Sequence, residues 1–352
     1  MKPTIYALPP RLTHSPYLTH LHNALADRYT IHEGSLWQAL REMVMKRDLC
    51  IFHIHFFDEI IQRPRWLWAW IRMIGFVALL MFLRWRGVHI LWTVHNLRPH
   101  TCWHEDIAHK SVQHVINQCH AVTCHHHVTR QQLLNTFAVQ IPVTVVPHGH
   151  AESPFGPLLS RQLARQQLGL ADDILMFLCL GMIRPYKGID TAIAAMVQIP
   201  QAHLIIAGAA SDKQYLSLIH RQTATQANIT VKPYFLPDSE AALYLAACDA
   251  LILPYRAITT SGMLMNAQAA GVVCVVPDLP SLAEQVQDGI TGFVYSAGMI
   301  DSLVDTLVRV IQHPQRDTIG IRAKASVQAH TWSHVAQQFH AVYARFFDVT
   351  AH

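Results

Sequence analysis

The first half of the chain alternates between short apolar runs rich in β-forming residues and longer stretches in which apolar residues recur with helical spacing. The apolar runs predict strands at residues 4–8, 49–56, 88–94, 121–124 and 143–147. The stretches between them predict helices at 17–25, 66–83 and 104–118. Strands that alternate with helices form right-handed βαβ units, so this half is expected to contain a parallel sheet.

The second half of the chain repeats this alternation. Its run at 174–180 is continuously apolar, which is typical of a strand buried on both faces of a sheet. Further strands are predicted at 203–208, 228–232, 250–255, 272–276 and 292–295. Helices are predicted to begin near Gly188 and to cover 212–225, 238–248, 261–271, 281–287, 300–312 and 318–330.

The stretch 148–160 carries glycine and proline between the two halves and is interpreted as a domain linker. The chain is expected to have an α/β fold with two Rossmann-like domains, residues 1–150 and residues 151–331. The last helix, within 332–352, is expected to pack back on the first domain. A length of 352 residues suits two domains of ordinary size.

Apolar residues make up 51% of the chain and charged residues 14%, against a charged share of about 25% in typical domains. Such a composition supplies two large cores and leaves apolar surface for contact with lipid. The net charge of +4 suits phosphate groups or an anionic membrane and is too small to indicate nucleic-acid binding. The N-terminal residues contain no long apolar segment, so no secretory signal is expected.

Seven cysteines are scattered along the chain without a CxxC pair, and several lie in predicted strands. They are expected to be buried free thiols in a reducing cytoplasm. Of the 25 histidines, His125, His126 and His127 are consecutive. Consecutive side chains point in different directions, so these three are interpreted as surface or helix-start residues and not as metal ligands.

The predicted helix 66–83 contains a single charge, Arg72, and is at the lower limit of length for spanning a bilayer. It lies between two strands of one predicted sheet, and a span would separate those strands across the membrane. We expect a helix that packs on the sheet and dips into the membrane interface. Aromatic and basic residues would then lie at headgroup level: Trp66, Trp68, Trp70 and Trp85, flanked by Arg63, Arg65, Arg84 and Arg86. The alternative is an ordinary crossover helix buried in the protein.

The segment LCLGMIRPYKGID, residues 178–190, places two cations directly after a buried strand. The strand ends at Gly181, Arg184 and Lys187 follow, and Gly188 opens a helix. Ligands of α/β folds bind at the carboxyl ends of parallel strands. A planar guanidinium and a compact ammonium together suit a diphosphate, whereas the alternative is a solvated basic loop.

A second loop follows the predicted strand at 250–255. Thr259, Thr260, Ser261 and Gly262 stand at a predicted helix start, where hydroxyl groups cap the helix and free backbone N–H groups point outward. The helix dipole reinforces such a site for an anion. Simple capping is the alternative, and the cationic loop favours the phosphate interpretation.

The order GxxRPYKG, LPY…SG…AxAxG and PSLAEQVQDGITGFVY (280–295) resembles the nucleotide-binding half of GT-B glycosyltransferases. In the first half, similarity to bacterial exopolysaccharide β-mannosyltransferases of the xanthan type rests on SPYLTHLHNAL (15–25), HIHFFDE (53–59), HNLRPH (95–100) and HGH (148–150). More distantly, the chain resembles the family-4-like group. The resemblance implies the GT-B fold, with a cleft between two Rossmann-like domains that closes about the linker and excludes water.

This resemblance implies a hexosyltransferase that moves a sugar onto a lipid-linked oligosaccharide in exopolysaccharide biosynthesis, with mannose from GDP-mannose as the suggested case. The nucleotide sugar is the donor substrate. No other cofactor and no metal are expected, because no DxD-like motif stands out, and an inverting outcome is expected. The acceptor would be held at the membrane surface, which predicts a cytoplasmic protein peripheral to the inner membrane.

The resemblance also implies roles for single residues. Arg184 and Lys187 would stabilise the charge of the leaving diphosphate. Asp58 would be the base that removes the acceptor proton, and its alternative role is a helix N-cap. His95 would bind the donor sugar or the acceptor, or else be a core histidine. Glu59, His55 and His14 are reserves for the base, and the acceptor-binding set is His14, Tyr17, His55 and Asn96.

The expected donor-binding set comprises Gly181, Tyr234, Phe235, Thr260, Ser261, Gly262, Met263, Asn266 and Glu284. Tyr234 and Phe235 would border the nucleobase, or else lie in the core. Many relatives carry two glutamates eight positions apart, and the matching positions here are Ile258 and Asn266. Asn266 can hydrogen-bond a ribose hydroxyl, whereas Ile258 cannot bind a sugar hydroxyl.

Three other functions compete with this interpretation. A dinucleotide-dependent oxidoreductase requires a GxGxxG motif after a strand, and the sequence lacks one. A non-catalytic GT-B scaffold, binding a sugar nucleotide as a partner subunit, is favoured by Ile258 and Asn266 and disfavoured by the intact Arg184 and Lys187. A histidine-rich metal carrier is the third.

Overall fold

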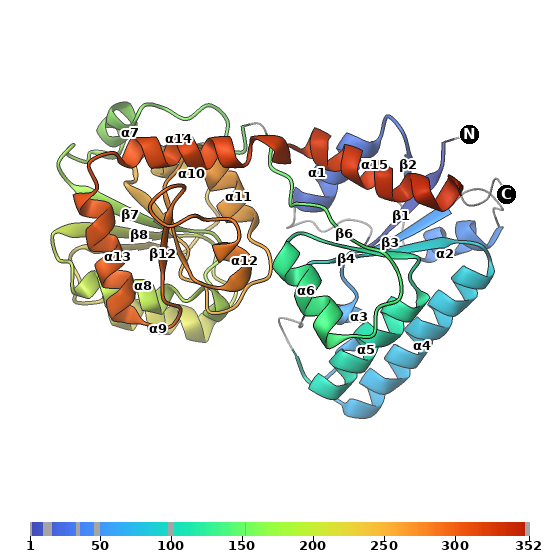
Figure 1. Cartoon of the computed structure of the whole chain (residues 1–352). Helices are drawn as coiled ribbons and strands as arrows, with labels where there is room; N and C mark the ends of the chain where they lie inside the picture. The colour runs from blue at the N-terminus through green and yellow to red at the C-terminus, as the bar shows by residue number, and fades with distance from the viewer. Residues whose placement is uncertain are drawn as a thin grey trace. The chain divides into compact units, whose positions relative to one another are not determined.

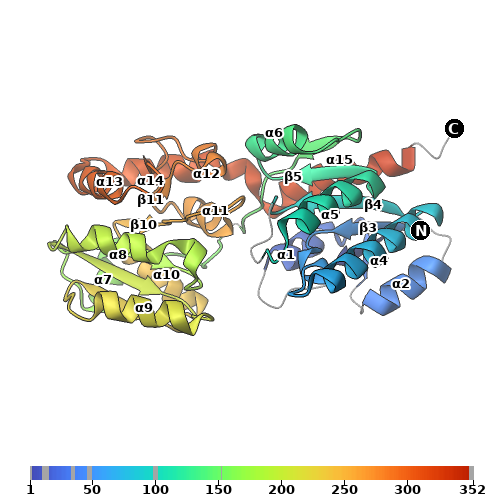
Figure 2. The same cartoon turned by 90° about the horizontal axis from the view of Figure 1, so that it is seen from below.

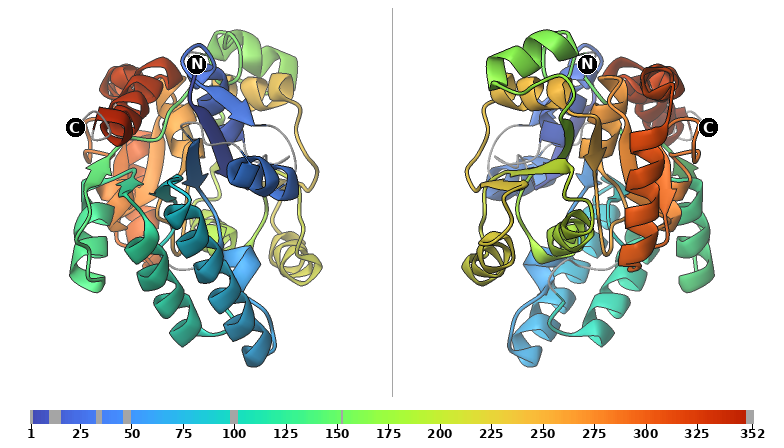
Figure 3. Two further views of the ribbon diagram at one scale, coloured as in Figure 1. Left: turned by 90° about the vertical axis from the view of Figure 1, so that its right-hand side faces the viewer. Right: turned by 90° about the vertical axis from the view of Figure 1, so that its left-hand side faces the viewer.

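The computed structural model of the chain describes residues 2–9, 16–32, 36–45, 50–97, 102–151 and 153–348 (Figure 1). The chain divides into two compact units. Unit 1 comprises Met1–Gly149 together with Trp332–His352, and unit 2 comprises His150–Thr331. Each unit contains one six-stranded parallel sheet. Helices cover both faces of each sheet (Figures 2 and 3), so the predicted architecture of two Rossmann-like folds is confirmed.

The sheet of unit 1 has the strand order β2-β1-β3-β4-β5-β6. Its strands are β1 (Thr4–Leu8), β2 (Thr30–His32), β3 (Cys50–Ile54), β4 (His89–Val94), β5 (Ala121–Cys124) and β6 (Val143–Val145). Its helices are α1 (Pro16–Leu25), α2 (Leu36–Met45), α3 (Asp58–Ile61), α4 (Trp66–Trp85), α5 (Glu105–Gln118), α6 (His127–Thr136) and α15 (Trp332–Asp348). The order of the strands reverses between β1 and β3, because β2 lies on one side of β1 and all later strands lie on the other.

Two hydrophobic cores form on the faces of this sheet, because successive side chains of a strand point to opposite faces. Phe52 and Trp92 lie in the core that α3, α4 and α5 cover. Ile51 and Leu91 lie in the core that α1 and α15 cover. Burial on both faces explains why β3 and β4 carry apolar residues without strict alternation.

The C-terminal helix α15 packs on unit 1, as the sequence predicts. Its residues Phe339 and Tyr343 are buried in the core shared with α1. The Tyr343 hydroxyl lies 2.8 Å from Nδ1 of His53 in β3, and the Tyr29 hydroxyl lies 2.8 Å from Nδ1 of His340. Because hydrogen bonds are directional, these contacts fix the position of the helix on the sheet.

The sheet of unit 2 has the strand order β12-β11-β10-β7-β8-β9. Its strands are β7 (Leu175–Leu180), β8 (Ala202–Ala207), β9 (Ile229–Lys232), β10 (Ala250–Ile252), β11 (Cys274–Pro277) and β12 (Phe293–Tyr295). The α-helices are α7 (Arg161–Leu168), α8 (Ile189–Val197), α9 (Lys213–Thr223), α10 (Asp238–Ala247), α11 (Gly262–Ala269), α12 (Pro280–Ala283), α13 (Ile300–Gln312) and α14 (Arg316–Ser326). Two 3-10 turns are η1 (Pro185–Lys187) and η2 (Gln328–His330).

A buried ion cluster ties α7 to the start of β7. Arg165 is fully buried and donates to the Asp249 carboxylate at 2.8 Å and to the carbonyl oxygen of Ile174 at 2.6 Å. Asp249 also accepts from the backbone N–H of Met176 at 2.8 Å and from Arg161. Removing one partner of such a buried pair leaves an uncompensated charge, which typically costs about 3–5 kcal/mol.

Cysteines and histidines follow the sequence-based expectations only in part. The structure describes all seven cysteines; none forms a disulfide, and all except the exposed Cys102 are buried. His127 begins α6, as expected for a helix-start residue. His126 is buried, but it is the N-cap of α6 and therefore also a helix-start residue. His125 is buried at the end of β5, so its interpretation as a surface or helix-start residue is wrong. The physical reason is that β5 ends inside unit 1, where α6 begins.

Candidate functional site

The strand order of unit 2 reverses between β7 and β10. β8 and β9 continue from β7 on one side, and β11 and β12 continue from β10 on the other. In open α/β sheets, ligands bind outside the carboxyl ends of the strands at such a switch point. The loops that carry the predicted phosphate-binding residues follow these two strands directly, at residues 181–188 and 253–261.

Backbone and side-chain contacts join the two loops. The N–H of Arg256 donates to the carbonyl oxygen of Tyr186 at 2.9 Å, and the Arg256 guanidinium pairs with the Asp190 carboxylate. Gly188 has a φ of 65°, and a Cβ at this position would overlap the carbonyl oxygen of Pro254. Only glycine therefore fits where the loops cross.

Lys187 lies where the two loops meet. Its Nζ is 3.1 Å from the Tyr255 hydroxyl oxygen and 4.6 Å from the centroid of the Tyr255 ring. The Tyr255 hydroxyl lies 2.9 Å from Ser261 Oγ. Ser261 Oγ accepts from the backbone N–H of Leu264 at 3.1 Å, which makes Ser261 the N-cap of α11. The Tyr255 hydroxyl therefore connects the Lys187 ammonium group to the N-terminus of α11.

Among the described residues, Lys187 has no carboxylate partner for its charge. Within the part of the chain that the structure describes, no ion pair includes Lys187. Burial alone lowers the pKa of this lysine, but the Tyr255 and Tyr186 side chains outweigh burial, and the net direction is upward. The ammonium group therefore stays protonated at neutral pH and can bind an anion.

Two further polar groups on these loops have no hydrogen-bond partner among the described residues. Arg184 Nε and Thr260 Oγ1 are buried, and neither has a hydrogen bond to any described residue. An unsatisfied buried polar group costs about 1–3 kcal/mol, and native proteins keep such groups mainly where a ligand or water satisfies them. Arg184, Lys187, Thr260 and the N-terminus of α11 therefore form a set that suits a phosphate-bearing ligand.

Other predicted donor-binding residues adjoin this set. Gly181 has a φ of 116°, and a Cβ there would lie 3.8 Å from Lys187 Nζ and 4.0 Å from Met263 Cε. Gly262 is the first residue of α11, and Asn266 lies four residues later and is partly buried. These positions place Gly181, Gly262 and Met263 beside Lys187 and Ser261.

The structure does not bring Tyr234 and Phe235 to this set through any contact between described residues. Tyr234 and Phe235 are exposed after β9, the edge strand of the sheet, and the Tyr234 hydroxyl donates to Glu240 at 2.7 Å. Glu284 is exposed at the end of α12. Ile258 packs on the core under α11, and its carbonyl oxygen accepts from Ser281 at 3.1 Å, which is a structural role.

In unit 1, the predicted base Asp58 follows β3, one of the two strands at the switch point of that sheet. Asp58 is the first residue of α3, and the N-cap is Phe57, so the alternative role of Asp58 as a cap is not observed. Burial, assisted by the charge of Glu59, raises the pKa of Asp58 to about 6. A carboxylate with a pKa close to neutrality is suited to general-base catalysis.

Polar residues form two rows across β3, β4 and β5, on the face that α1 and α15 cover. In the first row, Thr93 Oγ1 lies 2.7 Å from both His53 Nε2 and Thr123 Oγ1. In the second row, which begins two residues later in each strand, His95 lies 3.2 Å from both His55 and His125. The second row therefore stands at the carboxyl ends of three adjacent strands: His55, His95 and His125.

Both ring nitrogens of His95 are engaged in this second row. His55 Nδ1 faces His95 Nε2, and His125 Nε2 faces His95 Nδ1. The His95 ring also stacks on Phe56, and the Tyr17 ring meets it edge-on at 4.7 Å. A direct bond from His95 to a sugar, as predicted, would require the row to open.

The remaining predicted acceptor residues lie around this row. Tyr17 is buried at the start of α1 with its ring near His55, and Asn96 is partly buried directly after His95. His14 lies outside the described residues. Among the residues that are described, no group of three or more His, Cys, Asp or Glu side chains is arranged to hold a metal ion.

Helix α4 presents an apolar surface to solvent. It is long and apolar enough to cross a bilayer by length and composition, a test that the core helices of soluble proteins also pass. Leu67, Ile74 and Trp85 are more than half exposed, and Trp66 and Trp68 are exposed as well. Figure 2 shows α4 beside α5 on one face of the sheet, and the described part of unit 1 leaves these residues of α4 exposed.

Some predicted membrane residues of α4 make contacts within unit 1. Trp70 is partly buried against the core, with Lys110 Nζ 5.1 Å from its ring centroid. Arg84 donates to the carbonyl oxygens of Gln118 and Asn117 at the end of α5, at 3.1 and 3.3 Å. Arg72 donates to a backbone carbonyl at 3.3 Å. These contacts position the side chains and reduce the number of N–H groups free for lipid phosphates.

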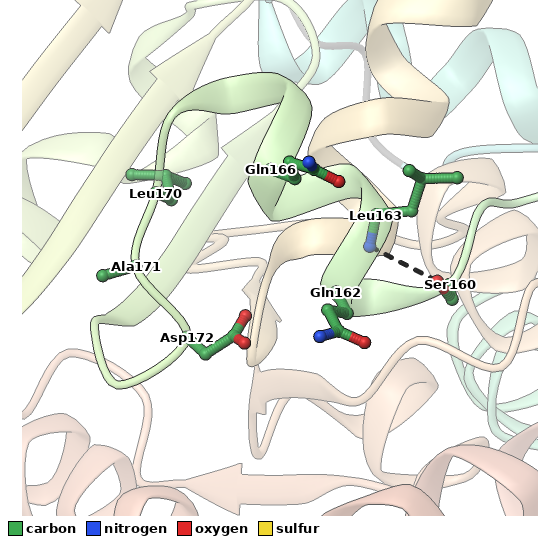
Figure 4. A pocket seen from close by; sticks show the side chains of 7 residues that line it. All are labelled: Ser160, Gln162, Leu163, Gln166, Leu170, Ala171 and Asp172. Atoms are coloured by element: carbon green, nitrogen blue, oxygen red, sulfur yellow. Dashed lines mark hydrogen bonds between the residues drawn. The ribbon is translucent and has the colours of Figure 1, made fainter.

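A separate open hollow of about 560 Å³ lies on α7 and the turn that follows it (Figure 4). Ser160, Gln166 and Asp172 are among its lining residues. This turn precedes β7, so the hollow stands at the amino-terminal edge of the sheet. Its position opposite the carboxyl ends of the strands makes it an unsuitable place for the predicted ligand.

Tyr255 and His125 join the site, although sequence reasoning did not assign them a role. Tyr255 connects Lys187 to Ser261, and His125 completes the second row of unit 1. For Tyr255, the available signal was its position at the end of the predicted strand at 250–255. For His125, the signal was a polar residue repeated two positions apart at the ends of three successive strands.

Comparison with known proteins agrees with this geometry. Residues 160–326 match the family described as Glycosyl transferases group 1. This region contains Arg184, Lys187, Thr260 and the N-terminus of α11. Over 322 residues, the chain is 26% identical to the GDP-mannose:glycolipid 4-beta-D-mannosyltransferase of Xanthomonas campestris pv. campestris, covering 88% of this chain and 84% of the relative.

Two solved structures share the fold of the whole chain. Sucrose-phosphate synthase from Thermosynechococcus elongatus has a TM-score of 0.77 and 17% identity, covering 99% of this chain and 100% of that one. Anabaena Alr3699/HepE in complex with UDP and glucose has a TM-score of 0.76 and 16% identity, covering 98% and 100%. Unit 2 is therefore a group 1 glycosyl transferase domain, and the chain is a glycosyltransferase with the GT-B fold.

Proposed function

We propose that the chain transfers a mannosyl residue from GDP-mannose to a lipid-linked saccharide in exopolysaccharide biosynthesis. The observation that carries this proposal is Lys187, a cation without a carboxylate partner among the described residues, joined through Tyr255 to the N-terminus of α11. That arrangement suits the diphosphate of a nucleotide sugar. The name of the Xanthomonas relative supports GDP-mannose as donor and a glycolipid as acceptor.

In the proposed reaction, the acceptor oxygen attacks the anomeric carbon of the donor and the bond from that carbon to the diphosphate oxygen breaks. Lys187, Arg184 and the N–H groups of α11 stabilise the charge that develops on the leaving diphosphate. Asp58 takes the proton of the acceptor hydroxyl, for which its raised pKa is suited. A single displacement of this kind inverts the anomeric centre, and side-chain cations neutralise the diphosphate without a metal ion.

A donor panel tests this proposal. GDP-mannose, UDP-glucose and dTDP-glucose are compared by thermal shift, and transfer to octyl glycosides of hexoses and hexuronic acids is then measured. GDP-mannose is expected to raise the melting temperature most and to support transfer. The absence of any stabilisation by nucleotide sugars contradicts the proposal. Donor binding with neither sugar transfer nor donor hydrolysis favours a non-catalytic scaffold.

We further propose that α4 attaches the protein to the cytoplasmic side of the inner membrane. Its exposed tryptophans and apolar residues suit the interfacial region of a bilayer, and adjoining arginines suit anionic headgroups. The test is sedimentation with vesicles of mixed zwitterionic and anionic phospholipids.

The informative variant replaces Trp66, Trp68 and Trp85 by Ser, and the matched control is Ile321→Ser, an exposed apolar residue of α14 in unit 2. The wild type and the control are expected to sediment with vesicles, and the triple variant is expected to stay in the supernatant. Equal sedimentation of all three proteins contradicts the proposed role of α4, and a dimer without vesicles identifies a second copy as the occupant of this face.

A further inference from the structure

The second row of unit 1, His55, His95 and His125, has no part in the reaction proposed above. Its three imidazoles are buried and linked in series. The row ends on a backbone carbonyl, because His125 Nδ1 lies 2.9 Å from the oxygen of Val146. This end determines the direction of every hydrogen bond in the row.

A carbonyl oxygen only accepts, so His125 must carry its proton on Nδ1 and donate it to Val146. Burial lowers the pKa of all three rings, of His125 to about 3, so each ring is neutral at pH 7 and has a single N–H. His125 Nε2 therefore accepts from Nδ1–H of His95. His95 Nε2 in turn accepts from Nδ1–H of His55. The nitrogen that remains, His55 Nε2, is an unprotonated hydrogen-bond acceptor.

His55 Nε2 and the Tyr17 hydroxyl are both buried, and neither has a hydrogen-bond partner among the described residues. The Tyr17 ring meets the His55 ring at 5.7 Å and the His95 ring at 4.7 Å, both edge-on. Among the described residues, one acceptor and one O–H donor without a hydrogen-bond partner thus belong to the same cluster of rings. Buried polar groups are normally satisfied, and a ligand is one means of satisfying them.

We propose that Tyr17 and His55 bind hydroxyl groups of the saccharide acceptor, and that His95 and His125 are positioning residues that fix the tautomer of His55. A ligand O–H donates to His55 Nε2, and a ligand oxygen accepts from the Tyr17 O–H. Hydroxyl groups meet both demands, whereas a carboxylate or carbonyl group satisfies Tyr17 alone. This inference rests on the proposed transfer reaction and assigns no proton transfer to the histidines.

The substitution His125→Phe tests the direction of the row. It removes the acceptor for Nδ1–H of His95, so His95 and His55 can adopt the opposite tautomer, with the proton on Nε2. His125→Gln is the matched control, because its side-chain oxygen still accepts from His95. Two-bond 1H–15N spectra of histidine-labelled protein are expected to show Nδ1–H at His55 in the wild type and in His125→Gln. Nε2–H at His55 in the wild type overturns the inference.

Acceptor kinetics test the hydroxyl site with a second variant, Tyr17→Phe. Because the phenolic O–H has no partner in the described protein, this variant is expected to keep its folding stability, measured by tryptophan fluorescence. With the octyl glycoside of the panel that reacts fastest, KM for the acceptor is expected to rise about tenfold from the loss of one hydrogen bond. KM for the donor is expected to stay unchanged.

The outcomes separate this inference from the proposed function. Intact transfer with an unchanged acceptor KM in Tyr17→Phe overturns the hydroxyl site and leaves the transferase proposal standing. If the wild type neither binds the donor nor transfers the sugar, the transferase proposal itself is contradicted. If His125→Phe does not fold, Tyr17→Phe and the wild-type spectrum still decide the question.

Discussion

Acidification is expected to destabilise unit 1 because four of its buried histidines stay neutral in the folded state. Burial lowers the pKa of His53, His55 and His95 well below 6.5, and the pKa of His125 to about 3. In the unfolded chain these rings regain an ordinary pKa near 6.5. Between the two values the unfolded state binds more protons than the folded state, so stability falls as pH falls below about 6.5.

The magnitude follows from proton linkage. For each ring that stays neutral when folded, lowering the pH from 7.5 to 5.5 costs about 1.4 kcal/mol of unfolding free energy. The four rings together cost about 5.5 kcal/mol, a large fraction of a typical domain stability. Asp58 acts in the opposite direction, because its pKa is raised to about 6. It offsets about 0.8 kcal/mol over the same interval.

Urea denaturation at the two pH values measures this effect. All eight tryptophans lie in the residues of unit 1, so their fluorescence follows the unfolding of that unit alone. His125→Gln removes one of the four rings and should reduce the loss of unfolding free energy between the two pH values by about 1.4 kcal/mol. His114→Gln, an exposed position on α5, is the control and should retain the full loss. Equal unfolding free energies of the wild type at both pH values would refute the reasoning.

Two further predictions concern single groups of the proposed reaction. Tyr255→Phe removes the hydroxyl between Lys187 and Ser261 and is expected to lower kcat/KM for the donor about fivefold to tenfold. Circular dichroism is expected to show an unchanged fold. Unchanged kinetics would exclude Tyr255 from positioning Lys187. Asp58→Asn is expected to abolish transfer, while the donor affinity measured by calorimetry stays the same. Activity in Asp58→Asn would show that a neighbouring residue is the base.

The fold could be predicted because its signals are local. The run 174–180 is apolar throughout, and the structure has β7 at Leu175–Leu180. The helices α6 and α7 were not predicted, since their sequences, HVTRQQLLNT and RQLARQQL, contain few apolar residues to mark a helical period. For such short polar helices, tertiary packing and capping outweigh the hydrophobic pattern.

The candidate site was predictable only where its residues are near in sequence. Arg184 and Lys187 share one loop, so the sequence alone predicted that they lie close together. The bridge through Tyr255 depends on how a loop after β7 meets a loop after β10, and no local pattern encodes that contact. The second row of histidines likewise requires the register of three parallel strands, which pairs Leu91 with Ala121 and so aligns His95 with His125.

Calorimetric titration with GDP tests most directly whether Lys187 holds a diphosphate. Lys187→Ala is expected to weaken GDP binding about tenfold to a hundredfold, as for the loss of a charged hydrogen bond, and to leave the affinity for guanosine unchanged. Lys213→Ala, an exposed lysine at the start of α9, is the matched control and should bind GDP like the wild type. Equal GDP affinity in the wild type and in Lys187→Ala would contradict the account.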